Sequence, residues 1–201
     1  MRTILIIFCF MALFNSCANS QEIKENNTRL EQILKNRRSI RSYTGNSINH
    51  DTLQRIVKAG AFAPSSYGQN PVEFVVVEDK AELAAVARAK RIGAPSVREA
   101  AAAIVVIADT SKGELWIEDA SVAAGYILLA AEDLGIGACW NQIRDRDGQR
   151  LSASDEIKQI LGIPSQYEVL CVIALGHKAE NKAARTEREM KVQQRTHFEK
   201  F

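Results

Sequence analysis

The chain has 201 residues, of which 26 are lysine or arginine and 24 are aspartate or glutamate. The two charges are nearly balanced and interspersed, which argues against a nucleic-acid-binding protein and against a protein held on an anionic membrane by a basic patch. Residues 21–201 are enough for one domain with a sizeable core, and nothing in the sequence supports a second domain.

Residues 1–20 have the pattern of a signal peptide. A positively charged start at Arg2 precedes an unbroken apolar run over residues 4–14, and Ala18 and Ser20 are small residues of the kind a signal peptidase reads. A membrane-spanning helix needs about 20 apolar residues, so a permanent span is the weaker interpretation. We therefore expect export from a bacterial cell, with a cytoplasmic protein as the alternative.

Two forms of export remain open. Cys17 follows the apolar run, as the lipid-modified cysteine of a bacterial lipoprotein does, which would give a lipid-anchored protein. The Phe14-Asn15-Ser16 sequence before it departs from that pattern. Cleavage after Ser20, giving a free periplasmic protein, is the other form.

A basic segment follows the first predicted helix, which covers residues 28–36. Arg37, Arg38 and Arg41 lie within five residues, with Ser39 among them. Guanidinium groups bind phosphate through paired hydrogen bonds, and a serine hydroxyl adds a further donor. The segment is a candidate site for the phosphate of a nucleotide or for a developing anion. A solvated basic turn is the alternative.

A polar loop over residues 63–71 joins a second predicted helix, residues 51–62, to a predicted buried strand, residues 74–77. Prolines bracket this loop, and Gly68 lets its backbone approach a ligand closely. An ordinary turn-rich connection would have the same composition.

The middle of the chain alternates helices and apolar strands. We predict a helix over residues 81–89, a buried strand over 103–108 and the longest helix over 115–134. Small residues are dense on the first half of this last helix. Such residues allow close backbone packing, so we expect this helix at the centre of the fold.

Two glycines, Gly135 and Gly137, lead from this helix into a short extended segment that ends at Gln142. A further helix is predicted to open at Ser154 and to stop at Gly162. Residues 169–175 form the last predicted core strand. The tail from residue 180 is too polar to fold alone, so it either frays or lies on a partner.

The remaining residues with chemical potential are few. Cys139 and Cys171 lie in apolar surroundings, where a buried inert thiol is expected, although a disulfide between them stays open. His50, His177 and His197 are scattered and are interpreted as surface or structural residues. The sequence has no Walker loop, dinucleotide-binding glycine fingerprint, zinc-ligand spacing or Ser-His-Asp arrangement.

From residue 28 to about residue 185, the ordered set of these elements resembles the nitroreductase family of flavoproteins. Residues 37–41 match the opening motif of that family, and residues 139–144 followed by 161–164 match a common branch of it. The resemblance implies an α+β sandwich with a central mixed or antiparallel sheet flanked by helices. It also implies a domain-swapped homodimer that holds FMN at each of two subunit interfaces.

The resemblance implies cofactor contacts for the basic segment. Arg37 and Arg38 would lie near the phosphate and ribityl of FMN, with Ser39 as a donor. Arg41 would lie near the pyrimidine edge of the flavin. A cation there favours the negative charge that two-electron reduction places on the N1 and C2 carbonyl region.

Further contacts are implied from other parts of the chain. Pro64, Ser65 and Ser66 would come from the other subunit. Gln142 and the backbone of Ile143 would face N5 of the isoalloxazine, the atom that accepts hydride.

Lys182 and Arg185 are implied as further phosphate contacts, with a solvated charged tail as the alternative. Many family members have Asn, Gln and Trp where this chain has Gly68, Asn70 and Val72. These departures leave the pocket wall formed by that loop, and with it the substrate preference, open.

The implied activity is that of an FMN-dependent oxidoreductase. Hydride would pass from NAD(P)H, or from another donor, through flavin N5 to a nitroaromatic, a quinone or a similar acceptor in a ping-pong cycle. No catalytic side chain and no metal are implied, because the flavin does the chemistry. Nicotinamide nucleotides are not freely available outside the cytoplasm, so an exported FMN-binding protein without NAD(P)H turnover is the alternative.

Overall fold

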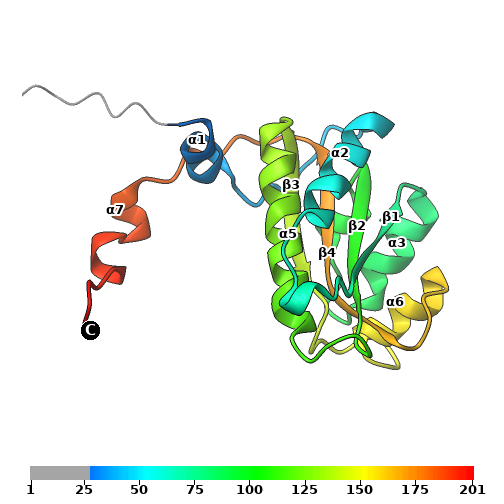
Figure 1. The fold of residues 1–201 in the computed structure, drawn as a ribbon. Coiled ribbons are helices and arrows are strands. Elements are labelled where there is room, and N and C mark those ends of the chain that lie inside the picture. Colours follow the sequence, from blue (N-terminus) through cyan, green and yellow to red (C-terminus); the bar gives the residue numbers. More distant parts are fainter. Residues whose placement is uncertain (1–27) are drawn as a thin grey trace, which may run out of the picture.

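The computed structural model describes residues 28–201, so the predicted signal segment and Cys17 lie outside the described residues. At the centre of the fold is a four-stranded antiparallel sheet in the order β1-β2-β4-β3 (Figure 1). The α+β class with a central sheet is confirmed, and the sheet is antiparallel rather than mixed. Its strands are β1 Val72–Val77, β2 Ala102–Asp109, β3 Ile136–Gln142 and β4 Tyr167–His177.

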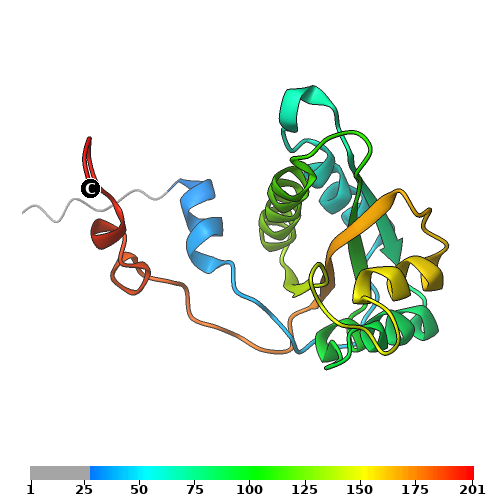
Figure 2. The same cartoon turned by 90° about the horizontal axis from the view of Figure 1, so that it is seen from below.

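Helices cover both faces of this sheet, as Figures 1 and 2 show. One face carries α2 (His50–Ala61) and α5 (Trp116–Asp133). The other carries α3 (Lys80–Ala89), α4 (Pro95–Arg98) and α6 (Ala153–Leu161). Helix α4 was not predicted, because a helix of four residues is too short to show a helical period.

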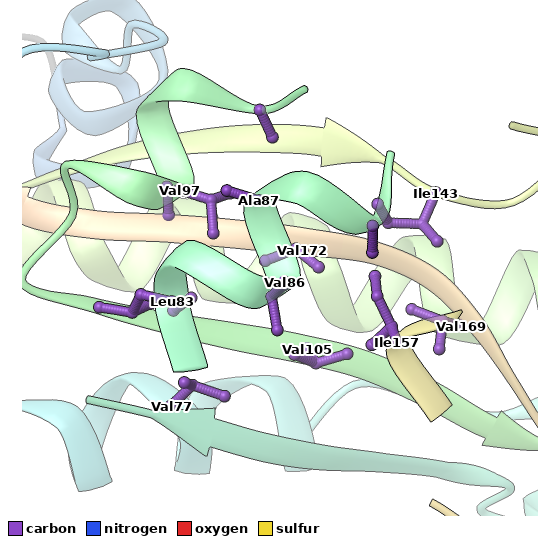
Figure 3. Close-up of a cluster of buried hydrophobic side chains, with 14 of the residues drawn as sticks. Val77, Leu83, Val86, Ala87, Val97, Val105, Ile143, Ile157, Val169 and Val172 are labelled. Atoms are coloured by element: carbon purple, nitrogen blue, oxygen red, sulfur yellow. The ribbon is translucent and has the colours of Figure 1, made fainter. Parts of the chain in front are cut away.

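The core is split into two clusters by the sheet. Successive side chains of a strand point to opposite faces, so Ile104 joins the cluster under α2 and α5, whereas Val105 joins the cluster under α3, α4 and α6. Figure 3 shows this second cluster, in which Val105 and Val172 of the two central strands meet Val86 of α3. All eight residues of β2 are buried, which agrees with its apolar sequence up to Asp109.

Two sequence predictions need correction. The strand predicted as buried over residues 74–77 is β1, which lies at one edge of the sheet and in which only Val77 is buried. The residue that caps α6 is Ser152, whose side chain accepts the N–H of Asp155, rather than Ser154. The Ser154 hydroxyl is instead used across the core, donating to Glu168 at 2.8 Å.

The expected central position of α5 is confirmed. Ala120, Ala124 and Ile127 on this helix are buried against the sheet and α2. Close packing between the two helices depends on Gly60 of α2, where an added Cβ would lie 2.8 Å from Cγ1 of Ile127. Helix α5 ends at Asp133, and Gly135 follows it with φ +73°, as the helix stop predicts.

Two segments stand away from the body of the domain (Figures 1 and 2). The first is α1 (Arg29–Asn36), and the second is the C-terminal segment with α7 (Glu187–Met190). Leu30 and Leu34 of α1 are 56% and 51% exposed, and no residue of α1 is fully buried. The helical period of α1 is confirmed, but the rest of the described chain does not cover its apolar face.

The two cysteines of the domain are free and buried. Cys139 on β3 belongs to one core cluster and Cys171 on β4 to the other, so they lie on opposite faces of the sheet. A disulfide between them is therefore excluded, and burial raises the pKa of the Cys171 thiol. Within residues 28–201, no helix is long and apolar enough to cross a membrane.

Candidate functional site

The basic segment after α1 is held in place by backbone hydrogen bonds. Ser39 forms a parallel bridge with Ala138 at the start of β3, and the Ile40 N–H donates to the Ala138 carbonyl at 3.0 Å. Tyr43 then pairs with Lys178, just beyond the end of β4. Arg37, Arg38 and Arg41 therefore project from backbone that two strands of the sheet position.

Tyr43 holds the segment after α1 against the end of β4. Its hydroxyl donates to the Ile40 carbonyl at 2.7 Å, and its ring lies against Gly176. An added Cβ at Gly176 would come within 2.5 Å of the Tyr43 ring, so the close approach requires glycine. Burial raises the pKa of Tyr43, which keeps the hydroxyl protonated as a donor.

The chain after β4 returns along the basic segment and brings further cations to it. Lys182 Nζ donates to the Ser39 carbonyl at 2.6 Å, and the Arg38 guanidinium donates to the Ala183 carbonyl. The Arg185 N–H donates to the Lys35 carbonyl at 2.8 Å. The segment with Lys182 and Arg185, far away in the sequence, thus lies alongside the three arginines, and these five residues are called the basic cluster.

Glu180 is a carboxylate within this cluster, and the sequence pattern did not identify it. Its Oε1 accepts the Arg41 N–H at 2.6 Å, the Ser42 N–H at 3.3 Å and a hydrogen bond from Lys182 Nζ at 3.0 Å. The Arg41 N–H and the Lys182 ammonium hold the pKa of Glu180 below its ordinary value. The one local signal was the spacing of Glu180 and Lys182, which puts both side chains on the same side of an extended segment.

Some donors of the cluster remain available. Within residues 28–201, the guanidinium groups of Arg37 and Arg41 and the hydroxyl of Ser39 have no hydrogen-bond or ion-pair partner. Arg37 and Arg185 also line a cavity of about 690 Å³ between α1 and the C-terminal segment. Guanidinium, ammonium and hydroxyl donors together match the needs of a phosphate group.

The polar loop after α2 forms a second set of candidate residues. The Ser66 N–H and Oγ both donate to Oδ1 of Asp119, at 2.9 and 2.8 Å. Ser65 and Asn70 hydrogen-bond to each other across the loop, at 3.1 and 3.0 Å. Pro64, Ser65 and Asp119 are among the residues that line a cavity of about 200 Å³.

Helix α5 separates the two sets. Arg29, at the start of α1, pairs with Asp133 in the last turn of α5 at 2.7 Å, whereas the loop is held at Asp119 in the first turn. At 1.5 Å per residue, these two carboxylates are about 21 Å apart along the helix axis. One copy of the chain therefore does not bring Ser65 and Ser66 to the basic cluster.

The third predicted contact lies at the end of β3. The Gln142 side chain is fixed, because its Oε1 accepts from Trp140 Nε1 at 2.9 Å and its Nε2 donates to the Arg144 carbonyl at 3.1 Å. The Ile143 N–H donates to the Leu170 carbonyl at 3.1 Å, so it is not a free donor. The Ile143 side chain is part of the core.

Comparison with known proteins gives consistent matches. The model of the nitroreductase family matches residues 34–116 and 83–177. A protein of Archaeoglobus fulgidus, provisionally named NADH dehydrogenase/NAD(P)H nitroreductase, is 36% identical over 160 residues, which cover 76% of this chain and 89% of the relative. The FMN reductase [NAD(P)H] of Bacillus subtilis is 27% identical over 75% of this chain and 66% of its own length.

A solved structure supports the same assignment. The FMN-dependent nitroreductase of Clostridium difficile R20291 superposes with a TM-score of 0.80 and is 40% identical. The match covers 84% of this chain and 98% of that protein. The fold and the sequence pattern thus agree over nearly all of that structure.

Replacing Glu180 by glutamine should destabilise the protein at pH 7 and have less effect in acid. The pKa of Glu180 is lowered in the folded chain, so its stabilisation is complete above the ordinary glutamate pKa and is lost as pH falls through the lowered value. Urea unfolding of Glu180→Gln and the parent at pH 7 and pH 3 measures the difference. Glu78→Gln, at an exposed position after β1, serves as the control. A difference for Glu180→Gln that is equal at both pH values would contradict this role.

Proposed function

The chain belongs to the nitroreductase family, and on that premise we propose that it is an FMN-dependent oxidoreductase that passes electrons from NAD(P)H to small acceptors such as nitroaromatics and quinones. The observation that carries the proposal is the gathering of cationic side chains from the two ends of the domain. These side chains belong to Arg37, Arg38, Arg41, Lys182 and Arg185.

The chemistry of this donor set fits FMN. Arg37, Arg38, Lys182 and Arg185 would hold its phosphate end, with the Ser39 hydroxyl as a neutral donor. Arg41 would stabilise negative charge on the ring system. When bound, FMN supplies hydride-transfer chemistry, so the chain itself needs to bind, orient and polarise rather than to provide a catalytic acid or base.

We propose that the working form is a homodimer with a cofactor site at each subunit interface. Two observations support this proposal: the basic cluster and the Pro64-Ser65-Ser66 loop lie at opposite ends of α5, and α1 exposes Leu30 and Leu34. A second copy would supply the missing loop to each cluster and cover this apolar face. Analytical ultracentrifugation that found FMN bound to a monomer would contradict it.

The function is tested by the absorbance spectrum of the purified protein, followed by anaerobic titration with NADH and with NADPH. We expect a yellow protein that bleaches with at least one nucleotide and regains its colour when a nitroaromatic or a quinone is added. Colourless protein that takes up no added FMN would refute the proposal. Yellow protein that neither nucleotide bleaches would instead indicate an FMN-binding protein with a different electron donor.

Export is retained as a proposal, resting on the apolar run of residues 4–14. An exported enzyme would need a donor other than free nicotinamide nucleotide. The N-terminal residue of the protein isolated from its own cells distinguishes the forms: a lipidated Cys17, a residue after Ser20, or an intact Met1 on cytosolic protein, which would contradict export.

Arg37→Ala should mainly weaken retention of FMN. The substitution removes a guanidinium group that has no partner within the described chain and that can bind the phosphate directly. Loss of one charge-assisted contact of about 1.5–3 kcal/mol corresponds to roughly a 10- to 150-fold rise in the FMN dissociation constant, measured by flavin fluorescence. Arg88→Ala, at an exposed position in the last turn of α3, is the charge-matched control. Unchanged retention in Arg37→Ala would remove the phosphate assignment.

Arg41→Ala should lower the midpoint potential of the bound flavin while retaining more FMN than Arg37→Ala. A cation near the ring favours the more negative, reduced form. Loss of about 1.4 kcal/mol of such stabilisation lowers the potential of a two-electron couple by about 30 mV. Arg41→Lys, which keeps the charge, should recover part of the shift. Spectroelectrochemistry measures the potential, and an unchanged or raised value in Arg41→Ala would contradict the role.

A further inference from the structure

Asp119 is a buried carboxylate that the proposed cofactor contacts do not include. It is 7% exposed, although aspartate is seldom buried without a partner. Within residues 28–201, both hydrogen bonds to its side chain come from Ser66, whose N–H and Oγ donate to the same Oδ1. Asp119 lies in the first turn of α5, whose core face packs against the sheet, so this carboxylate has a rigid support.

The loop that Asp119 holds has an unusual backbone. Tyr67 and Asn70 have positive φ values of 53° and 48°, which non-glycine residues seldom adopt, and Gly68 between them has φ +68°. The Tyr67 side chain is 93% exposed, so packing of this side chain does not hold the backbone there. Hydrogen bonds from Ser66 to Asp119 and between Ser65 and Asn70 hold it instead.

Both serine hydroxyls already donate within the chain, Ser66 Oγ to Asp119 Oδ1 and Ser65 Oγ to Asn70 Oδ1. The two residues differ in what they hold, because Ser66 ties the loop to α5, whereas Ser65 closes the loop on itself. Pro64 and Ser65 also line the cavity of about 200 Å³. Ser66 is thus the attachment point of the loop, and Pro64 and Ser65 are the part that it presents.

We propose that Asp119 is a positioning residue for the cofactor site: acting through Ser66, it fixes the loop so that Pro64 and Ser65 meet the FMN held by the basic cluster of the partner subunit. This inference rests on the proposed function. It assigns a role to a residue that the proposed cofactor contacts do not include, and it makes α5 the support from which the loop reaches the second site.

A double-mutant cycle in FMN binding tests this role. Asp119→Ala removes the acceptor of both hydrogen bonds and should raise the FMN dissociation constant about tenfold or more. Ser66→Ala keeps the N–H bond and should have a smaller effect. If Asp119 acts through Ser66, the double variant should bind FMN no more weakly than Asp119→Ala alone, because coupled residues are not additive. Asp119→Asn keeps the volume and an acceptor oxygen, so it should recover most of the affinity.

Asp79→Ala separates positioning from a general loss of stability. Asp79 caps α3 with two hydrogen bonds of 2.9 Å and lies outside both candidate sets, so its loss should lower the melting temperature without changing FMN affinity more than about twofold. Binding by Asp119→Ala equal to the parent, or effects of Asp119→Ala and Ser66→Ala that multiply, would overturn the proposal. If Asp119→Ala fails to fold, FMN binding by Ser66→Ala equal to that of the parent would overturn it equally. A parent protein that binds no FMN would instead refute the proposed function itself, and this role with it.

Discussion

The crossing between the segment after α1 and the chain leaving β4 is the constraint on which the candidate site depends. Neither segment has regular secondary structure of its own, and each gains its backbone partners from the other or from the start of β3. Glu180 adds a carboxylate to this crossing and neutralises part of a strongly basic cluster. Without that anion, the cations would repel one another before any ligand arrived.

Most of the fold could be predicted from the sequence, because its hydrophobic periodicity and its helix stops agree with the final structure. The buried parts of β2 and β4 are apolar runs, and glycines follow the ends of α5 and α6. What could not be predicted depends on topology. The exposure of β1 depends on which helices cover that edge of the sheet, and Ser154 has a partner on β4, whereas Ser152 caps α6.

The candidate site likewise contains some residues that the local sequence identifies and others whose roles depend on the fold. The basic segment was identifiable because its chemistry is local, with three arginines in five residues. Glu180 and Asp119 were not, because the groups that give them roles come from distant parts of the sequence. Ile143 is the opposite case. The family resemblance implies that its backbone faces the flavin, but its N–H already donates to the Leu170 carbonyl in this chain. Sequence patterns identify donors more readily than the residues that orient them.

Helix α5 fixes both the distance and the relative direction between two contacts at its ends. Asp119 near one end holds the loop and Asp133 near the other pairs with α1, and at 100° per residue these two positions face the same side to within about 40°. A single residue inserted between them would turn one carboxylate by about 100° relative to the other and separate them by a further 1.5 Å or so. Substitutions on the exposed side of α5 leave this spacing unchanged, whereas an insertion or deletion within the helix shifts one contact relative to the other.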